Sequence, residues 1–292
     1  MTHFEKKTEI NFQDGWVKVS IDAIVELLKP CHAQRIQLFV ASYLKMCFKL
    51  LDSPSNSFKL YGTHAFVQFS EKEEDSTVQV QDFSKFIQIF CDLCRESKTK
   101  DQEELRNIRI SGIKGLQGVL RKTLQEKQRD DLLNQHSKII IPALLFNLQE
   151  NIEDLGQSDA EDDDDSPRGM ADQVLRELLS RVTLSQICQV ISPLLDHLDD
   201  ANLWPTENSV AWAKLFMRSV RESYSQMIVK LILGQFNIIM SMKMTFFSDH
   251  VRKKNFEKQY EEIGGILHVV SEVCVIPGIN SLGSIAQVNI IT

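Results

Sequence analysis

Glycine and proline are scarce in this sequence, and their scarcity excludes several classes of fold. The 292 residues include only 12 glycines and 7 prolines. A sandwich or barrel needs many tight turns, which these two residue types commonly supply. With 43% hydrophobic residues, the chain still has enough apolar material for one long domain or two ordinary ones. We therefore expect an all-α protein.

The features of a secreted or membrane-spanning protein are also missing. The opening residues, MTHFEKK, contain no apolar run like that of a signal peptide, and six cysteines are too few for a disulfide framework in a chain of this length. The most apolar window, residues 227–247, contains Lys230 and Lys243, which are costly at the centre of a bilayer. We expect a protein of the reducing cytosol without a membrane span.

Motifs of catalysis and of cofactor binding are absent as well. None of the seven histidines lies in H-E-x-x-H, and neither G-x-S-x-G nor the phosphate loop G-x-x-x-x-G-K occurs. Cys91 and Cys94 form a C-x-x-C, but no second pair of cysteines or histidines completes a four-ligand zinc site. Because this motif lies on the apolar face of a predicted helix, we interpret both residues as buried structural cysteines. We expect no enzyme activity, no metal and no cofactor.

Negative charge is concentrated in one stretch of the chain. The net charge is −7, and residues 150–165 contain nine acidic residues and no Lys or Arg. Outside this stretch 31 acidic residues face 33 basic ones, so the low pI does not argue against an anionic partner surface. Residues 151–169, which end in EDDDDSPRG, are predicted to form a flexible acidic loop. Ser166, which precedes Pro167, is a candidate phosphorylation site in this loop.

Apolar residues recur at three- and four-residue spacing along most of the chain, which predicts helices. The clearest helix covers residues 31–51, with Phe39, Tyr43 and Leu51 on its apolar face. The other predicted helices cover residues 16–28, 58–69, 82–94, 103–122, 137–148, 174–182, 184–198, 208–224 and 225–240. Helix pairs that recur roughly every 40 to 50 residues resemble HEAT or armadillo units. We predict an α-solenoid of about five hairpins, with a globular helical domain as the alternative.

This pattern divides the chain into five predicted segments. They are an N-terminal tail (1–13), a first helical-repeat block (14–150), the acidic loop (151–169), a second repeat block (170–240) and a partly ordered, divergent C-terminal segment (241–292).

Three glycines follow one another at three-residue steps in the predicted helix 103–122. Gly112 and Gly115 match the G-x-x-G loop of one RNA-binding module, but their surroundings are helical. Together with Gly118 they leave a strip without side chains, on which another helix can approach closely. We therefore predict tight helix packing at this strip.

Basic residues gather on the same predicted helix and in the segment before it. They are Lys98, Lys100, Arg106, Arg109, Lys114, Arg121 and Lys122. Each is a candidate contact to an anionic lipid headgroup, worth about 1 kcal/mol near such a surface. The alternative is a solvated helix face. No nucleic-acid partner is expected, since no aromatic residues alternate with these charges.

Five segments, in the same order along the chain, resemble one known family. IRISGIKGLQGVLRKT at 108–123 resembles the most recognisable segment of the rolling blackout proteins. The supporting segments are YGTHAFVQF (61–69), PALLFNLQ (142–149), LRELLSRVTL (175–184) and DHLDDANLW (196–204). The resemblance, which covers roughly residues 15–235, implies a scaffold that holds a type III phosphatidylinositol 4-kinase complex at the cytoplasmic face of the plasma membrane.

The resemblance also implies partners and alternatives. The implied partners are an anionic membrane surface, an adaptor with tetratricopeptide repeats and, through this adaptor, the kinase. No small-molecule substrate is implied. A lipid esterase, as proposed for some members of the family, and an unrelated helical-repeat adaptor are the alternative functions.

Two departures from the family pattern are expected. Family members begin with a palmitoylated cysteine-rich segment, whereas no cysteine precedes Cys31 here, so a cytosolic location is expected if that segment is absent. From Phe236 onward the sequence is expected to diverge from the family.

Overall fold

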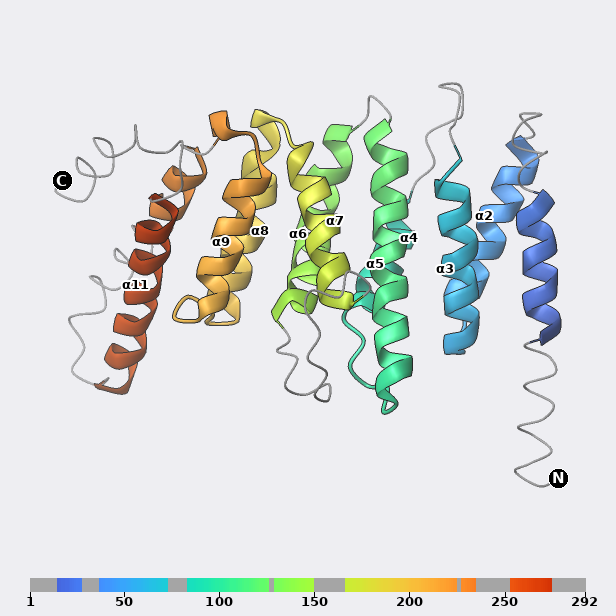
Figure 1. Ribbon diagram of the computed structural model, residues 1–292, viewed down its shortest axis with the longest axis horizontal. Coiled ribbons are helices and arrows are strands. Elements are labelled where there is room, and N and C mark those ends of the chain that lie inside the picture. The colour runs from blue at the N-terminus through green and yellow to red at the C-terminus, as the bar shows by residue number, and fades with distance from the viewer. Residues whose placement is uncertain are drawn as a thin grey trace. The chain divides into compact units, whose positions relative to one another are not determined.

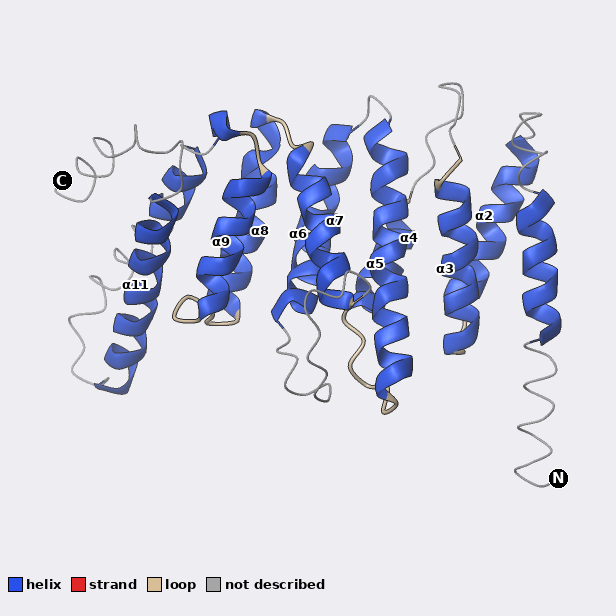
Figure 2. Ribbon diagram, viewed as in Figure 1, coloured by secondary structure: helices blue, strands red, loops and turns tan. Residues whose placement is uncertain are grey.

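The computed structural model describes residues 15–27, 37–72, 83–125, 129–149, 166–224, 227–234 and 253–274. Within these ranges every regular element is a helix, and no strand occurs (Figures 1 and 2). This confirms the all-α prediction. The described residues belong to two compact units, one within 1–132 and 143–172 and the other within 133–142 and 173–292. The five predicted segments stay predictions.

Where the connection is described, consecutive helices are joined by short segments, such as residues 52–55 between α2 and α3. Residues 15–27 form a helix, and residues 227–234 form another. The elements with defined bounds are α2 (Gln37–Leu51), α3 (Asn56–Ser70), α4 (Ser84–Cys94), α5 (Gln102–Gln125), α6 (Arg129–Gln149), α7 (Pro167–Ser180), η2 (Leu184–Gln186), α8 (Ile187–Asp200), α9 (Glu207–Ser219), η3 (Glu222–Tyr224) and α11 (Lys253–Cys274). α6 and α7 each contribute residues to both units.

One helix boundary that differs from the prediction is the start of α7. This helix begins at Pro167, so residues 167–169 of the predicted acidic loop are helical. Ser166 explains the early start, because its Oγ accepts a hydrogen bond from the backbone N–H of Gly169 at 3.0 Å. Proline suits the first helical position, where its missing N–H has no partner to lose. Residues 151–165 of the predicted loop lie outside the described residues.

A second boundary differs at the end of α9. The predicted helix 208–224 stops at Ser219, because Val220 adopts an extended backbone with ψ 165°. An extended residue interrupts the helical hydrogen-bond series, and only the short turn η3 follows.

Aromatic rings form the core of the first unit. α3 packs against α2 and α5, and α4 packs against α5. The ring of Phe66 in α3 stacks on Phe86 at 4.8 Å between centroids and lies 5.1 Å from Phe90, both in α4. The Tyr43 hydroxyl in α2 donates a buried hydrogen bond of 2.8 Å to the carbonyl of Ala65. These contacts join three helices through large apolar surfaces.

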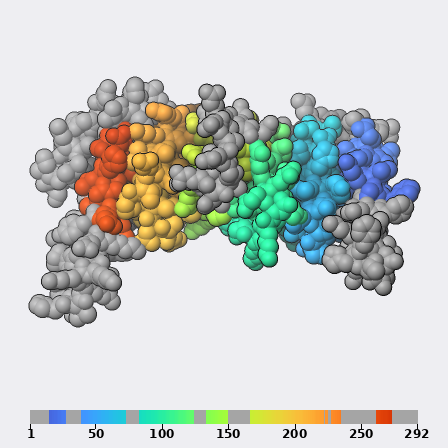
Figure 3. Space-filling model, turned by 60° about the horizontal axis from the view of Figure 1, so that its bottom comes forward, coloured from blue at the N-terminus to red at the C-terminus, as the bar shows by residue number. Residues whose placement is uncertain are grey.

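The glycine strip of α5 lies where this helix meets α3 and α4. A Cβ at Gly112 would lie 2.6 Å from the backbone nitrogen of Cys94, and a Cβ at Gly118 would lie 2.9 Å from Oγ of Ser70. A Cβ at Gly115 would overlap the ring of Phe90. The prediction of tight helix packing is therefore confirmed. Figure 3 shows α5, in green, at the surface beside the blue pair α2 and α3.

In the second unit α11 packs against α9. Gly265 of α11 lies directly against the backbone carbonyl of Trp204, where no Cβ would fit. An ion pair of 2.5 Å joins Lys214 of α9 to Glu272 of α11. α11 thus contacts its neighbours through close backbone packing at Gly265 and through the ion pair with Lys214.

Candidate functional site

The predicted lipid contacts are divided by the structure into buried and exposed residues. α5 carries five of the seven, and the acidic residues of this helix, Glu103 and Glu104, both lie in its first turn. Two of the five bases point into the protein, and the others remain at the surface.

Arg109 is buried, with 4% of its surface exposed. Its Nε donates a hydrogen bond of 2.8 Å to the carbonyl of Glu96, just beyond the end of α4. The guanidinium also lies 5.0 Å from the centroid of the Phe146 ring. Backbone carbonyls near a helix end lack hydrogen-bond donors within the helix, and Arg109 supplies such a donor to the carbonyl of Glu96.

Lys122 has the same role near the end of α3. It is 5% exposed, and its Nζ donates a hydrogen bond of 2.5 Å to the carbonyl of Lys72. The ammonium lies 4.6 Å from the centroid of the Phe69 ring. Neither Arg109 nor Lys122 is placed to contact a headgroup, so both leave the set of candidates for physical reasons.

The remaining five bases differ in their electrostatic surroundings. Lys98, Lys100, Arg106 and Lys114 are exposed, and Arg121 is partly exposed. The first three lie in or beside a segment that also carries five acidic residues: Asp92, Glu96, Asp101, Glu103 and Glu104. Only Lys114 and Arg121 lie on the part of α5 without acidic residues. The contact of these exposed bases with lipid headgroups stays a prediction.

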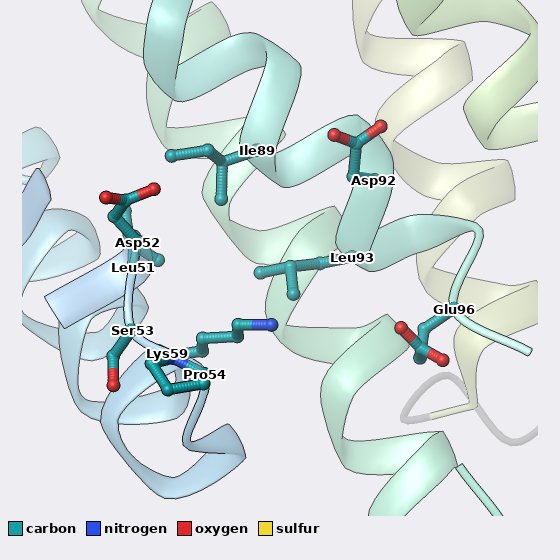
Figure 4. Close-up of a pocket in the computed structure, with 9 residues that line it drawn as sticks. All are labelled: Leu51, Asp52, Ser53, Pro54, Lys59, Ile89, Asp92, Leu93 and Glu96. Carbon is teal, nitrogen blue, oxygen red and sulfur yellow. The ribbon is translucent and has the colours of Figure 1, made fainter. Parts of the chain in front are cut away.

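A pocket of ≈ 340 Å³ lies between the α2–α3 turn and the end of α4 (Figure 4). Its lining residues are Leu51, Asp52, Ser53, Pro54, Lys59, Ile89, Asp92, Leu93 and Glu96. Its walls are partly apolar, and three carboxylates and one ammonium line it. Helical periodicity did not indicate this pocket, because its residues come from the α2–α3 turn, from the helices on either side of it, and from α4, which is distant in sequence.

The chemistry of this pocket is electrostatic. Neither histidine nor cysteine lines it, so it has no such base or thiol to activate Ser53. The Oγ of Ser53 instead accepts a hydrogen bond of 3.2 Å from the backbone N–H of Ser55. Glu96 Oε1 accepts the backbone N–H groups of Ser97 and Lys98 at 3.1 and 2.7 Å. These contacts order the turn and the loop around the pocket.

Cys91 and Cys94 are fully buried beneath the contact of α4 with α5. Burial raises the pKa of the Cys91 thiol to about 12 and that of the Cys94 thiol well above its ordinary value. Both are therefore neutral thiols at physiological pH, which are poor nucleophiles and poor metal ligands. The interpretation as buried structural cysteines is confirmed.

Ser166 is partly exposed and acts as the N-cap of α7. A phosphate on its Oγ would lie at a helix N-terminus, where negative charge is favourable. Phosphorylation of Ser166 stays a prediction.

Two features are absent from the described residues. They contain no group of three or more His, Cys, Asp or Glu side chains that could hold a metal ion. No helix among them combines the length and the apolar character needed to cross a bilayer.

Comparison with known proteins gives one consistent result. The family model described as EFR3, armadillo repeat, matches residues 6–287. Human EFR3 homolog B is 36% identical over 276 residues, which cover 92% of this chain and 32% of that protein. Human EFR3 homolog A is 32% identical over 94% of this chain, and the Drosophila melanogaster homolog cmp44E is 33% identical over 74%. No solved structure matches.

The family match extends beyond the segments that carried the resemblance. It continues to residue 287, past Phe236, and the expected divergence from that residue onward stays a prediction. The chain spans about a third of the length of the human relatives named above. The helical hairpins, their armadillo-type sequence and these relatives together establish that the chain belongs to the EFR3 family, the rolling blackout proteins, as part of its armadillo-repeat region.

Proposed function

We propose that this chain is a non-enzymatic scaffold that helps to hold a phosphatidylinositol 4-kinase complex at the cytoplasmic face of the plasma membrane. Membership of the EFR3 family, from the match over residues 6–287, is the observation that carries this proposal. Stacked helical repeats bind partners along extended surfaces, which suits a scaffold. The implied partners are an adaptor with tetratricopeptide repeats and, through it, the kinase.

The small free energy expected from contacts of the basic residues with lipid favours protein contacts as the main attachment of the first unit. Each base near an anionic leaflet contributes about 1 kcal/mol, so Lys114 and Arg121 together contribute about 2 kcal/mol. The other three exposed bases are offset by the five acidic residues near them. Stable attachment to a membrane generally takes two signals. We therefore expect the charged surface of α5 to assist an attachment made by other contacts.

The lipid part is tested by sedimentation with vesicles of phosphatidylcholine, with and without phosphatidylserine, at rising salt. We expect weak binding only to the vesicles that contain phosphatidylserine. This binding should be lost near physiological salt, where charges are screened over about 8 Å. Lys114→Glu with Arg121→Glu should abolish it. Arg218→Glu with Lys230→Glu changes two exposed bases of the second unit and should have less effect. Absence of binding at low salt would remove direct lipid contact from the proposal.

The kinase part is tested by expressing the tagged chain in cells and purifying it with its partners. Recovery of the phosphatidylinositol 4-kinase and its adaptor is the expected result. Recovery of nuclear transport receptors without the kinase would contradict it and would favour an unrelated adaptor. A serine-reactive probe that labels the chain, with loss of labelling on replacement of that serine by alanine, would instead favour a lipid esterase.

A further inference from the structure

The pocket between the α2–α3 turn and the end of α4 combines an apolar interior with a charged rim. Leu51 and Leu93 are buried, with 1% and 4% of their surfaces exposed. Ile89 is half-buried beside them, whereas Asp52 and Asp92 are exposed. Figure 4 shows Ile89 and Leu93 extending from α4 toward the turn. A ligand in this pocket would therefore lie against carbon atoms inside and meet carboxylates at the edge.

Negative charge dominates the rim. The lining includes three carboxylates, Asp52, Asp92 and Glu96, and one ammonium, Lys59, which gives a net charge of −2. Figure 4 places the three carboxylates on different sides of the pocket. The Asp92 carboxylate accepts a hydrogen bond of 3.1 Å from the amide of Gln88, and Glu96 accepts backbone N–H groups. Because these donors are neutral, they leave the negative charge uncompensated.

Contacts outside the pocket hold its walls in place. The ring of Phe48 in α2 packs edge-on against Phe86 in α4, with 6.0 Å between centroids. The backbone N–H of Asp52 donates to the carbonyl of Phe48 at 2.9 Å, and that of Ser53 donates to the carbonyl of Leu50 at 3.2 Å. A site that is formed before binding loses little conformational entropy when a ligand enters.

The sign and the spacing of the charges exclude two classes of ligand. The net negative charge would repel anionic lipid headgroups and nucleic acids. A metal ion needs several oxygen ligands within about 2.6 Å of one point. The described residues contain no group of three or more His, Cys, Asp or Glu side chains that could hold such an ion. The carboxylates are therefore spaced for separate positive groups on an extended ligand.

A basic peptide with an aliphatic side chain fits this lining. Arg and Lys pair with carboxylates, and their aliphatic stems pack on apolar surface. The volume of ≈ 340 Å³ lies within the range of about 300 to 1,000 Å³ that is usual for ligand sites. We propose that the pocket binds a short basic segment of a partner protein, with an aliphatic side chain against Ile89 and Leu93 and with Arg or Lys paired with Asp52 and Asp92. The proposal does not rest on the kinase-scaffold role.

Lys59 opposes the binding of a positive ligand. It is the one base among the described residues that line the pocket, and Figure 4 shows its side chain extending toward α4. A cationic ligand is repelled by this ammonium and attracted by the carboxylates. Removal of the Lys59 charge should therefore strengthen binding, whereas removal of a carboxylate should weaken it.

Fluorescence anisotropy with three labelled peptides measures the binding. The peptides share one Gly-Ser frame and carry Arg-Leu-Arg, Glu-Leu-Glu or Arg-Ser-Arg at the centre. Each is titrated with the 292-residue chain at low ionic strength, because salt screens exposed charges. Arg-Leu-Arg should bind most tightly, and Arg-Ser-Arg should bind more weakly because it lacks an apolar side chain. Glu-Leu-Glu should not bind.

Substitutions in the pocket should change the affinity in opposite directions. Asp52→Asn and Asp92→Asn should each weaken the binding of Arg-Leu-Arg by up to about fivefold, the range for exposed ion pairs. Lys59→Gln should strengthen it by a similar factor. Ile89→Ala should weaken the binding of Arg-Leu-Arg and leave that of Arg-Ser-Arg unchanged, which distinguishes a lost apolar contact from a loss of folding.

The matched control removes charge away from the pocket. Glu207→Gln with Glu261→Gln changes two exposed carboxylates of the second unit, so it alters the net charge as much as Asp52→Asn with Asp92→Asn does. The control should leave the affinity unchanged. It therefore separates the pocket from the general attraction of basic peptides to a chain with a net charge of −7.

Four results would overturn the proposal. Equal weakening by the control pair and by the pocket pair would show that the peptide responds only to overall charge. Weaker binding after Lys59→Gln would place the peptide elsewhere. Equal affinity for Arg-Ser-Arg and Arg-Leu-Arg would assign the pocket to small polycations, and the absence of binding to Arg-Leu-Arg would remove the site. Recovery of the kinase from cells is a separate measurement, so either proposal can fail alone.

Discussion

At the scale of single residues, Arg109 and Lys122 join the end of one helix to the side of another. Each donates a hydrogen bond to a backbone carbonyl beyond a helix end, and each lies against an aromatic ring. A buried carbonyl that loses its donor is left unsatisfied, which is costly because no water replaces the donor. Their positive charges therefore stabilise the fold from within.

This arrangement predicts a difference between buried and exposed bases. Arg109→Gln and Lys122→Gln should each lower the free energy of unfolding by about 1 to 3 kcal/mol. Lys114→Gln, at an exposed position on the same helix, should change it by less than about 0.5 kcal/mol. Urea unfolding followed by circular dichroism measures all three. Equal stability of the Arg109 and Lys114 variants would contradict the structural role.

Two helical glycines, one in the glycine strip of α5 and one in α11, are predicted to respond in opposite ways to replacement by alanine. Alanine is a better helix former than glycine by about 1 kcal/mol. Gly264 in α11 has no atom within 4 Å of an added Cβ, so Gly264→Ala should stabilise the protein. At Gly115 the Phe90 ring occupies that space, and overpacking costs about 1 to 3 kcal/mol.

Urea midpoints of the two variants, compared with the unchanged chain, provide the measurement. Gly115→Ala should unfold at a lower urea concentration and Gly264→Ala at a higher one. A gain in stability at Gly115 would show that α5 and α4 are not in close contact there.

At the scale of elements, the start of α7 depends on its cap. Ser166 Oγ accepts the N–H of Gly169, and the carbonyl of Ser166 accepts the N–H of Met170 at 3.0 Å. The side-chain bond satisfies one of the N–H groups that the first helical turn leaves without a partner.

Removal of this cap gives a third prediction. Ser166→Ala should lower the free energy of unfolding by about 1 kcal/mol. Ser166→Asp should retain the stability, because a carboxylate also accepts the N–H group and interacts favourably with the helix dipole. Thermal unfolding of both variants distinguishes the cap from a side chain without a role, for which the two substitutions would behave alike.

At the scale of the whole molecule, three buried thiols link stability to pH. Burial raises the pKa of Cys47 and Cys91 to about 12, and the pKa of Cys94 also lies well above 9.0. In the unfolded chain these thiols lose their protons near their ordinary pKa. Above pH 9 the unfolded state therefore binds fewer protons than the folded state, and stability falls as pH rises.

The predicted loss is about 1.4 kcal/mol per pH unit for each thiol between pH 9 and about 12. Below pH 8 these groups should contribute no pH dependence. Urea unfolding at pH 8 and at pH 10 tests this, and Cys47→Ala should reduce the difference between the two values whatever its effect at pH 8. Rapid labelling of Cys91 by iodoacetamide at pH 8 would contradict its burial.

Much of the helical fold was predictable because helix formation leaves a periodic trace in the sequence. The apolar spacing through Phe39, Tyr43 and Leu51 indicated α2, since one face of a packed helix must be apolar. The strip at Gly112, Gly115 and Gly118 indicated close packing, because glycine is otherwise unfavourable inside a helix. The early start of α7 was missed, although Ser166 and Pro167 are the residue types that begin a helix.

The candidate site was less predictable. A positive charge at Arg109 or Lys122 has the same sequence signature as one at Lys114, since all three lie on one helix. The pocket between Asp52 and Asp92 has no local signature either, because a turn and a distant helix form it together.

The amino-acid sequence by itself determined that this protein is helical, that its helices carry apolar faces, and that it belongs to the EFR3 family. These properties depend on residues near one another in the chain, and short-range periodicity records them. Only the tertiary structure decided which bases are buried beneath helix ends and which apolar residues, such as Trp16, remain in water. Burial depends on which helices come together in space, and contacts between distant residues are not encoded in any local pattern.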